Sequence, residues 1–132
     1  MSNHIHIIAN SPDGELSNTM CDFKKITAKN IIESITNDNE SRKEWILNRF
    51  QFNAQRHSRK EKYQMWTHEN HAIVIYSPQF ALEKLEYLYN NPVRDGFVRK
   101  PEDYVYSSAS NYAGIESVLE IIELDVLWKT YF

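Results

Sequence analysis

The stretch Asn3-His4-Ile5-His6-Ile7-Ile8 alternates polar and apolar residues close to the start of the chain. Such alternation with β-branched residues predicts a half-buried β-strand, in which residues two apart point the same way. The pattern places His4 and His6 on one face, and Ile5 and Ile7 on the other as anchors to a core. Two adjacent imidazoles can hold one divalent cation between them. The alternative is the polar, solvent-facing side of an edge strand, and His-x-His alone does not decide between the two.

The length and composition are those of one globular domain. The chain has 132 residues, of which 42% are hydrophobic and 25% charged, enough for a single core over residues 1–132. Its one cysteine, Cys21, excludes an internal disulfide and a thiolate zinc cluster, which fits a reducing cytoplasm. The sequence shows neither a secretory leader nor an apolar run long enough to cross a membrane. We therefore predict a cytoplasmic protein with no membrane partner.

Charge is distributed unevenly along the chain. The formal net charge is −3, which argues weakly against a general nucleic-acid binder. Acidic residues gather in residues 101–132, where Lys129 is the one basic residue. Residues 42–62 instead contain seven basic residues and two acidic ones. A local basic surface of this kind is compatible with a partner that offers a phosphate backbone.

Hydrophobic spacing predicts helices that alternate with short strands. Apolar residues recur every three or four positions in three segments, which predicts helices over residues 16–36, 42–52 and 79–91. Pro92 sets the predicted end of the third helix, because proline disfavours helical geometry in the residue before it. Strands are predicted over residues 63–66 and 72–76, an exposed basic loop over 53–62, and an acidic helical extension over 113–132, with its helix over 115–131.

The helix predicted over residues 79–91 brings further polar residues to one face. Lys84, Tyr87 and Asn91 follow one another at steps of three and four. Tyr87 can present its phenol to a site on a neighbouring sheet, and Asn91 can offer an amide oxygen to a hard cation. Two imidazoles and one amide oxygen leave coordination positions open, as a catalytic metal requires. Tyr89 competes with Tyr87 as nucleophile, although its side of the helix favours a place in the core.

Several basic residues are candidates for contact with a phosphate backbone. Lys24 and Lys25 lie on the outer face of the first predicted helix, where lysines are most often simply solvated. The loop over residues 53–62 is either a solubilising connector or an electrostatic clamp on phosphates, and the sequence favours neither. The candidate DNA-binding residues are Lys24, Lys25, Arg56, Arg59, Lys60 and Lys84.

Four segments resemble the motifs of one family and follow one another along the chain in that family's order. Residues 3–8 have the form His-hydrophobic-His, and Tyr87 stands four residues before the dipeptide Asn91-Pro92. Residues 16–31, with DFKK inside them, resemble the helix that follows the His strand, and residues 100–104 (KPEDY) and 106–109 (YSSA) resemble the closing segment. Over residues 1–112 the chain thus resembles the REP-associated tyrosine transposases, a branch of the HUH single-tyrosine transposases.

The resemblance implies an α+β fold, a ferredoxin-like antiparallel sheet with helices packed on one face. Members of the family have a strand and a helix before the His strand, so both are expected to be missing from this N-terminally short copy. The resemblance also implies that His4, His6 and Asn91 bind Mg²⁺ or Mn²⁺ and that Tyr87 is the nucleophile. The implied reaction is the nicking and joining of single-stranded or hairpin DNA through a 5′-phosphotyrosine intermediate, as in DNA transposition and recombination.

Two other functions stay open. The chain can be a catalytically inactive module from the same family, which holds hairpin or single-stranded DNA without cutting it. It can also be a structural, dimerising α+β domain whose two histidines are incidental. A homodimer that pairs an exposed edge strand is compatible with each of these functions. A metal titration separates the structural domain from the other two, and an assay for a covalent adduct separates the enzyme from the binding module.

Overall fold

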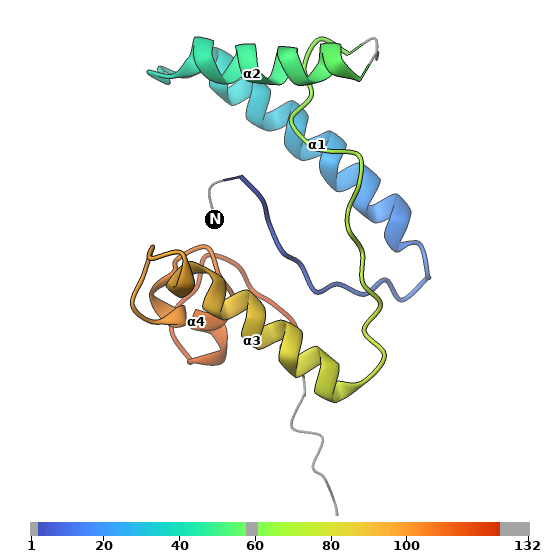
Figure 1. Cartoon of the computed structure of the whole chain (residues 1–132), viewed down its shortest axis with the longest axis vertical. Coiled ribbons are helices and arrows are strands. Elements are labelled where there is room, and N and C mark those ends of the chain that lie inside the picture. The colour runs from blue at the N-terminus through green and yellow to red at the C-terminus, as the bar shows by residue number, and fades with distance from the viewer. Residues whose placement is uncertain (1–2, 58–60, 125–132) are drawn as a thin grey trace, which may run out of the picture. The chain divides into compact units, whose positions relative to one another are not determined.

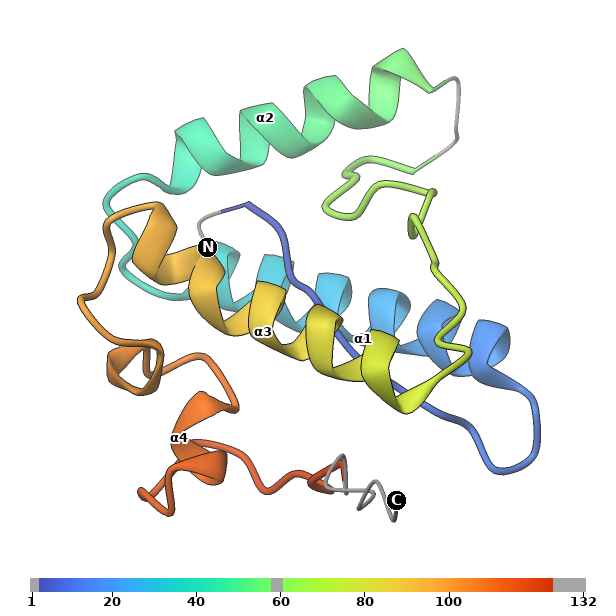
Figure 2. The same cartoon turned by 60° about the horizontal axis from the view of Figure 1, so that its bottom comes forward.

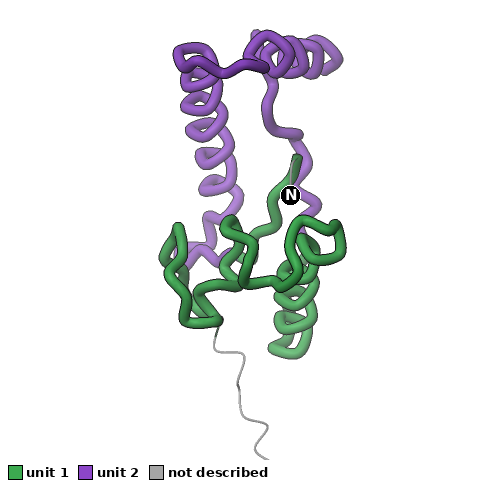
Figure 3. Tube along the Cα trace, turned by 90° about the vertical axis from the view of Figure 1, so that its left-hand side faces the viewer, with its two compact units in different colours: residues 1–8, 73–132 green, residues 9–72 purple. Residues whose placement is uncertain are grey.

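The computed structural model describes residues 3–57 and 61–124, where its regular elements are helical (Figures 1 and 2). They are α1 (Leu16–Asn37), α2 (Lys43–Arg56), α3 (Pro78–Arg94), the 3₁₀ turn η1 (Pro101–Asp103) and the single turn α4 (Ala109–Tyr112). By its internal contacts the chain divides into two units, residues 1–8 with 73–132, and residues 9–72 (Figure 3).

No β-strand is present in the described residues, so the predicted ferredoxin-like antiparallel sheet is wrong. The segments with strand-like sequence, residues 3–8, 63–66 and 72–76, lie there without a ladder partner. Alternation of polar and apolar residues indicates that a segment can bury one face. A sheet also needs partner strands elsewhere in the chain. Ile5 and Ile7, the predicted core anchors, are each 50% exposed.

The unit of residues 9–72 is built on α1, and the helix predicted over residues 16–36 is confirmed. A turn precedes it, in which the carboxylate of Asp13 accepts a hydrogen bond from the N–H of Glu15 (3.0 Å). The half-buried side of α1 follows the predicted spacing of three and four, with Leu16, Met20, Phe23 and Thr27. The second predicted helix is also confirmed, and it continues to Arg56 as α2.

The segment that follows α2 is joined to both helices of its unit. The N–H of Gln64 donates to the carbonyl of Phe50 in α2 (3.0 Å). The indole Nε1–H of Trp66 donates to Oγ1 of Thr27 in α1 (2.9 Å). These bonds hold an irregular segment against a helical pair. The side chain of Gln64 is 8% exposed; its Nε2 donates to the carbonyl of Trp66 (3.1 Å), and its Oε1 has no hydrogen-bond partner among the described residues.

The element that carries the candidate site is α3, which is longer than the sequence predicts. Ser77 caps its first turn, because the side-chain oxygen accepts a backbone N–H. The predicted end was Asn91, but the helix continues through Pro92 to Arg94. Proline removes one backbone hydrogen bond from a helix, and here the loss falls in the last turn only. Asn91 and Pro92 are both buried, and we attribute the extension of the helix to that burial.

The chain that follows α3 folds back on the same helix. The N–H of Phe97 donates to the carbonyl of Pro92 (2.9 Å), and η1 packs against both α3 and α4. Tyr89 of α3 contacts Tyr112, with ring centres 5.7 Å apart, and its hydroxyl lies 3.1 Å from Oγ of Ser108. These contacts tie the aromatic segment over residues 104–112 to α3.

The acidic helix predicted over residues 115–131 is wrong in its described part. Residues 115–124 contain no helix, and residues 125–131 lie outside the described residues. Leu119 and Ile122, which have helical spacing in the sequence, are 71% and 94% exposed. A short amphipathic helix is stabilised mainly by the surface that covers its apolar face, and these side chains have no such cover.

Few side chains are fully buried in the described residues. The buried apolar ones are Pro92 and three alanines, Ala54, Ala81 and Ala109. The buried polar ones are Gln64, Asn91 and Ser110. Buried polar side chains are uncommon and need a hydrogen-bond partner, and one of them, Asn91 in α3, is also a predicted metal ligand.

Candidate active site

Helical spacing places Tyr87, Asn91 and Arg94 on one side of α3. They follow one another at steps of four and three residues, so their side chains are neighbours along two turns. Lys84, which the sequence places on the same face, lays its ammonium over the ring of Phe80, 4.9 Å from the ring centre. This face belongs to the unit that also contains the two N-terminal histidines.

His4 and His6 lie side by side near the N-terminus. Their ring centres are 5.0 Å apart and their planes are nearly perpendicular, at 87°. The Nδ1 of His4 lies 2.7 Å from Oδ1 of Asn3. Because that amide oxygen can only accept, Nδ1 is the donor of this bond, and in a neutral ring the free lone pair is then on Nε2. Asn3 therefore fixes the tautomer in which His4 can bind a metal through Nε2.

The ring of His6 also contacts the ring of Tyr87, although the two residues are far apart in the sequence. Their ring centres are 5.8 Å apart and their planes meet at 82°. In Figure 1 the N-terminal segment runs alongside α3, which carries Tyr87. Partial burial lowers the pKa of His6, and the nearby His4 lowers it further. Both effects favour the neutral imidazole, which is the form that binds metals.

The ring centres of the two histidines are separated by a distance that a shared divalent cation would also give. A metal about 2.1 Å from one nitrogen of each ring lies about 3.2 Å from each ring centre. Two rings that meet at roughly 100° at the metal then have centres about 5 Å apart, and those of His4 and His6 are 5.0 Å apart. The described residues contain no cluster of three or more His, Cys, Asp or Glu side chains suited to a metal. A cation held by this pair would therefore need further ligands.

Asn91, the predicted third ligand, is engaged by another residue. Its Oδ1 accepts a hydrogen bond from the guanidinium of Arg94, one turn further along α3. The side chain is 5% exposed, and its Nδ2 is buried without a hydrogen-bond partner among the described residues. The structure therefore brings His4, His6 and Tyr87 together by ring contacts and links Asn91 to them through Arg94.

Arg94 is the residue of this group that sequence reasoning missed. Its guanidinium carbon lies 5.0 Å from the centre of the Tyr87 ring, and its other contact is the bond to Asn91. The signal was present in the spacing, seven residues after Tyr87 and three after Asn91. It was hidden because Pro92 led us to end the helix at Asn91, whereas α3 ends at Arg94.

The two tyrosines of α3 have different surroundings. Tyr87 is 48% exposed, and its hydroxyl makes no hydrogen bond with any described residue. Tyr89 is half-buried, and its hydroxyl pairs with Ser108. Burial raises the pKa of Tyr89, with smaller effects from Ser108 in the opposite direction and from Tyr112 in the same one. Of the two phenols, Tyr87 is the one open to a substrate.

The other predicted DNA-binding residues lie in the 9–72 unit or outside the described residues. Lys24 donates to the carbonyl of Thr67 (2.8 Å), which gives it a structural role in that unit. Lys25 is exposed and lies 4.0 Å from the carboxylate of Asp22. The Arg56 guanidinium lies 5.8 Å from the centre of the Phe52 ring. Arg59 and Lys60 lie outside the described residues.

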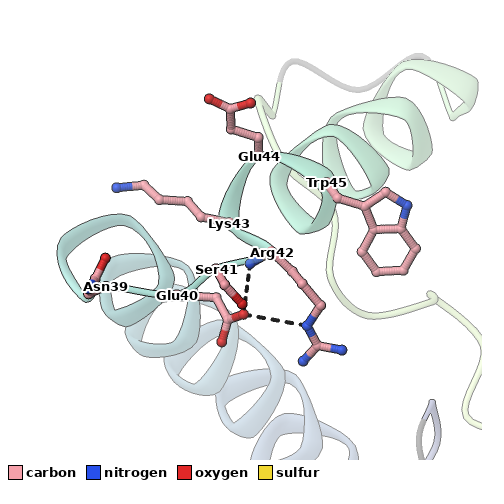
Figure 4. Close-up of a pocket in the computed structure, with 7 residues that line it drawn as sticks. All are labelled: Asn39, Glu40, Ser41, Arg42, Lys43, Glu44 and Trp45. Atoms are coloured by element: carbon pink, nitrogen blue, oxygen red, sulfur yellow. Dashed lines mark hydrogen bonds and ion pairs between the residues drawn. The ribbon is translucent and has the colours of Figure 1, made fainter.

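The 9–72 unit also has a hollow at the turn between α1 and α2 (Figure 4). It is lined by residues 39–45, and Glu40 accepts hydrogen bonds there from the N–H (2.9 Å) and Nε (3.4 Å) of Arg42. None of the predicted site residues lines it. Within the described part of the chain, no helix combines the length and the apolar character needed to cross a membrane.

The comparisons with known proteins add no relative. The chain matches no protein-family model, no curated protein and no solved structure. The resemblance to the HUH transposases therefore rests on the motifs themselves.

Proposed function

We propose that this chain nicks and rejoins single-stranded or hairpin DNA through a 5′-phosphotyrosine intermediate, as a metal-dependent single-tyrosine transposase does. The observation that carries the proposal is the contact of His6 with Tyr87, whose ring centres are 5.8 Å apart. It brings a candidate nucleophile to a pair of imidazoles with the spacing of metal ligands. A structural domain with incidental histidines gives no reason for this meeting.

The proposed chemistry is a transesterification at phosphorus. The phenol oxygen of Tyr87 attacks a backbone phosphodiester, the bond to the 3′ oxygen breaks, and the phosphate becomes linked to Tyr87. The phenolic proton is lost and the leaving 3′ oxygen gains one, so a free 3′-hydroxyl results. Attack of a 3′-hydroxyl on the phosphotyrosine reverses these steps and joins strands without a nucleotide cofactor.

His4 and His6 would hold the divalent cation, Mg²⁺ or Mn²⁺, of this reaction. When bound, the cation supplies charge stabilisation at the phosphate. Asn91 is a third ligand only if its oxygen accepts the metal beside Arg94 or in its place, because a carbonyl oxygen has two lone pairs. We place the activity in the cytoplasm, since the lone Cys21 suits a reducing compartment.

A binding module that does not cut is the second candidate, and one observation favours it. The oxygen of Asn91 is occupied by Arg94, so the implied set of three metal ligands is not assembled. A protein with this arrangement can hold a phosphate backbone while it lacks the full coordination that cleavage requires. A homodimer is compatible with both candidates.

An adduct assay separates the two. Hairpin DNA is labelled in separate samples at its 5′ and 3′ ends, incubated with the protein and Mn²⁺, and run on a denaturing gel. We expect the 3′-labelled fragment to move with the protein, because the phosphate attached to Tyr87 belongs to it, and the 5′-labelled fragment to be released. Tyr87→Phe and His4→Ala should each abolish the shifted band. If the wild-type protein gives no adduct while native gels show that it binds the DNA, the enzyme is excluded and the binding module takes its place.

A further inference from the structure

We infer that Arg94, held by Asn91 and placed over Tyr87, is a phosphate-binding arm that takes a backbone phosphodiester of single-stranded DNA beside the nucleophile. This inference rests on the proposed function, since it names the group that brings the substrate to Tyr87. It assigns to Asn91 the anchoring of Arg94, a role different from that of a metal ligand.

The first support is the geometry of the guanidinium. Its carbon lies 5.0 Å from the centre of the Tyr87 ring, and its Nη2 donates to Oδ1 of Asn91. A guanidinium has five N–H donors in a rigid plane. One bond to Asn91 leaves the other donors of Arg94 without a hydrogen-bond partner among the described residues. A planar fork with free donors matches two oxygens of a phosphate.

The second support is that the charge of Arg94 is not neutralised. The side chain is exposed, and no ion pair of Arg94 occurs within residues 3–57 and 61–124. The adjacent Asp95 is also exposed and forms no ion pair with it. An unpaired cation beside an exposed phenol attracts the anionic group on which that phenol would act.

The third support is the anchor. Asn91 is 5% exposed, so the oxygen that receives Arg94 is held by a buried side chain in a helix. A surface arginine loses much rotational freedom when it binds an anion, and an arginine that is already held loses less. The ring of Tyr87 restricts the movement of the guanidinium on a second side. Arg94 is thus preorganised next to the proposed nucleophile.

The end of α3 does not work against an anion here. Carbonyls at a helix C-terminus carry partial negative charge and repel phosphate when they are free. The last carbonyls of α3 accept hydrogen bonds from the N–H groups of Asp95 (2.9 Å), Gly96 (3.0 Å) and Phe97 (2.9 Å). Because those carbonyls are satisfied, their repulsion of a phosphate is reduced, and the guanidinium of Arg94 is the positive group at the helix end, beside the exposed carboxylate of Asp95.

The test measures binding without chemistry. Fluorescence anisotropy of a labelled hairpin with a single-stranded tail is followed in EDTA, so that no divalent cation takes part, over a range of NaCl concentrations. Each phosphate contact on single-stranded DNA contributes about 0.7 to the slope of log affinity against log salt. We expect Arg94→Ala to reduce that slope by about 0.7. The matched control, Arg99→Ala, removes an exposed arginine of the same unit and should leave the slope unchanged.

Two further variants define the role more closely. Arg94→Lys keeps the charge but not the planar fork, so it should keep the slope and lose roughly fivefold in affinity, the loss expected for one hydrogen bond. Asn91→Ala should weaken binding in EDTA, because it releases Arg94, whereas the loss of a metal ligand has no effect without metal. If Arg94→Ala unfolds, which circular dichroism would show, Arg94→Gln replaces it as the charge deletion.

Methylphosphonate scanning locates the phosphate. Neutral linkages are placed one at a time along the oligonucleotide, and the position read by Arg94 is the one whose neutralisation weakens wild-type binding but not that of Arg94→Ala. The inference is overturned if no such position exists, or if Arg94→Ala and Arg99→Ala change the slope equally. Its failure is distinct from that of the proposed function, because the adduct assay can succeed when Arg94 is inert, and the slope can fall when no adduct forms.

Discussion

Deleting one hydroxyl group at each of two tyrosines gives the sharpest test of the site. Tyr87 and Tyr89 stand two residues apart on α3, and Tyr→Phe removes the same oxygen from both. The structure gives the two oxygens different environments. That of Tyr87 has no hydrogen-bond partner among the described residues, whereas that of Tyr89 lies 3.1 Å from Oγ of Ser108. The two variants should therefore show opposite effects on function and stability.

The expected magnitudes follow from these environments. Tyr89→Phe loses one partly buried hydrogen bond, which is worth about 1 kcal/mol of net stability, or a fall of roughly 4 °C in Tm for a chain of this size. Tyr87→Phe removes an exposed oxygen that has no hydrogen-bond partner among the described residues, so the free energy of unfolding should change by less than about 0.5 kcal/mol. For the reaction the order reverses, because Tyr87 is the proposed nucleophile.

The assays are urea unfolding followed by circular dichroism, and adduct formation with 3′-labelled hairpin DNA and Mn²⁺. We expect Tyr87→Phe to be as stable as wild type and to form no adduct, and Tyr89→Phe to be less stable and to form it. The reasoning is refuted if Tyr89→Phe abolishes the adduct at a temperature where it is folded, or if Tyr87→Phe retains it. An equal loss of stability in both variants would contradict the environments assigned to the two hydroxyl groups.

Four further predictions concern the parts that support the site. His4→Ala should raise the pKa of His6, because it removes the charge that helps to lower it; burial still lowers it, and the shift is read from imidazole proton resonances against pH. Since only the neutral ring binds metal, wild-type affinity for Mn²⁺ should decline as pH falls through the lowered pKa of His6. Asn3→Ala should weaken Mn²⁺ binding by about tenfold in calorimetry, because the tautomer of His4 is no longer fixed. Ser77→Ala should cost about 1 kcal/mol at the N-terminus of α3, seen as faster hydrogen exchange of the Phe80 amide.

The Asn3 and Ser77 variants each have a matched control. Asn10→Ala removes an exposed asparagine near the same segment and should leave Mn²⁺ binding unchanged. Ser17→Ala changes an exposed serine in α1 and should leave exchange in α3 unchanged. If the pKa of His6 does not rise in His4→Ala, the electrostatic coupling of the two rings is contradicted. Unchanged exchange at Phe80 in Ser77→Ala would show that the 3.2 Å bond between the two residues does not stabilise the helix.

The helices were predictable because their signals are local. Leu16, Met20, Phe23 and Thr27 mark one side of α1, and the structure half-buries all four. Helical hydrogen bonds join residues four apart, so a spacing within one segment contains most of what defines the element. The same holds for the start of α3, where a Ser-Pro pair gives the cap and the first turn.

The sheet was not predictable on the same basis. A strand is stable only with a neighbour, and the alternation of residues 3–8 says nothing about which segment would pair with it. Residues 72–76 have equally strong strand composition, and in the described structure Ile73 and Val74 are 63% and 81% exposed. Local pattern therefore overestimated both segments. The His-x-His spacing nevertheless indicated two adjacent imidazoles, and their rings are in contact.

The error at the end of α3 had the larger consequence for function. A rule about the residue before proline is a statement of backbone preference, and burial of a few side chains can override it. Because we ended the helix at Asn91, the next turn was excluded from the face that carries Tyr87. Arg94 then had no geometric relation to the site, and Asn91 was considered only as a metal ligand.

The ring and the hydroxyl group of Tyr87 have separable roles in this arrangement. The ring contacts His6 on one side and Arg94 on another, while the hydroxyl binds neither. Residues 3–8 have no strand partner in the described structure, and the Tyr87 ring joins the histidine segment to α3 through its contact with His6. Phenylalanine keeps that contact and removes only the reactive oxygen. Loss of the adduct in Tyr87→Phe would therefore report on the chemistry of the phenol, whereas its loss in an alanine variant would mix the chemistry with the positions of His6 and Arg94.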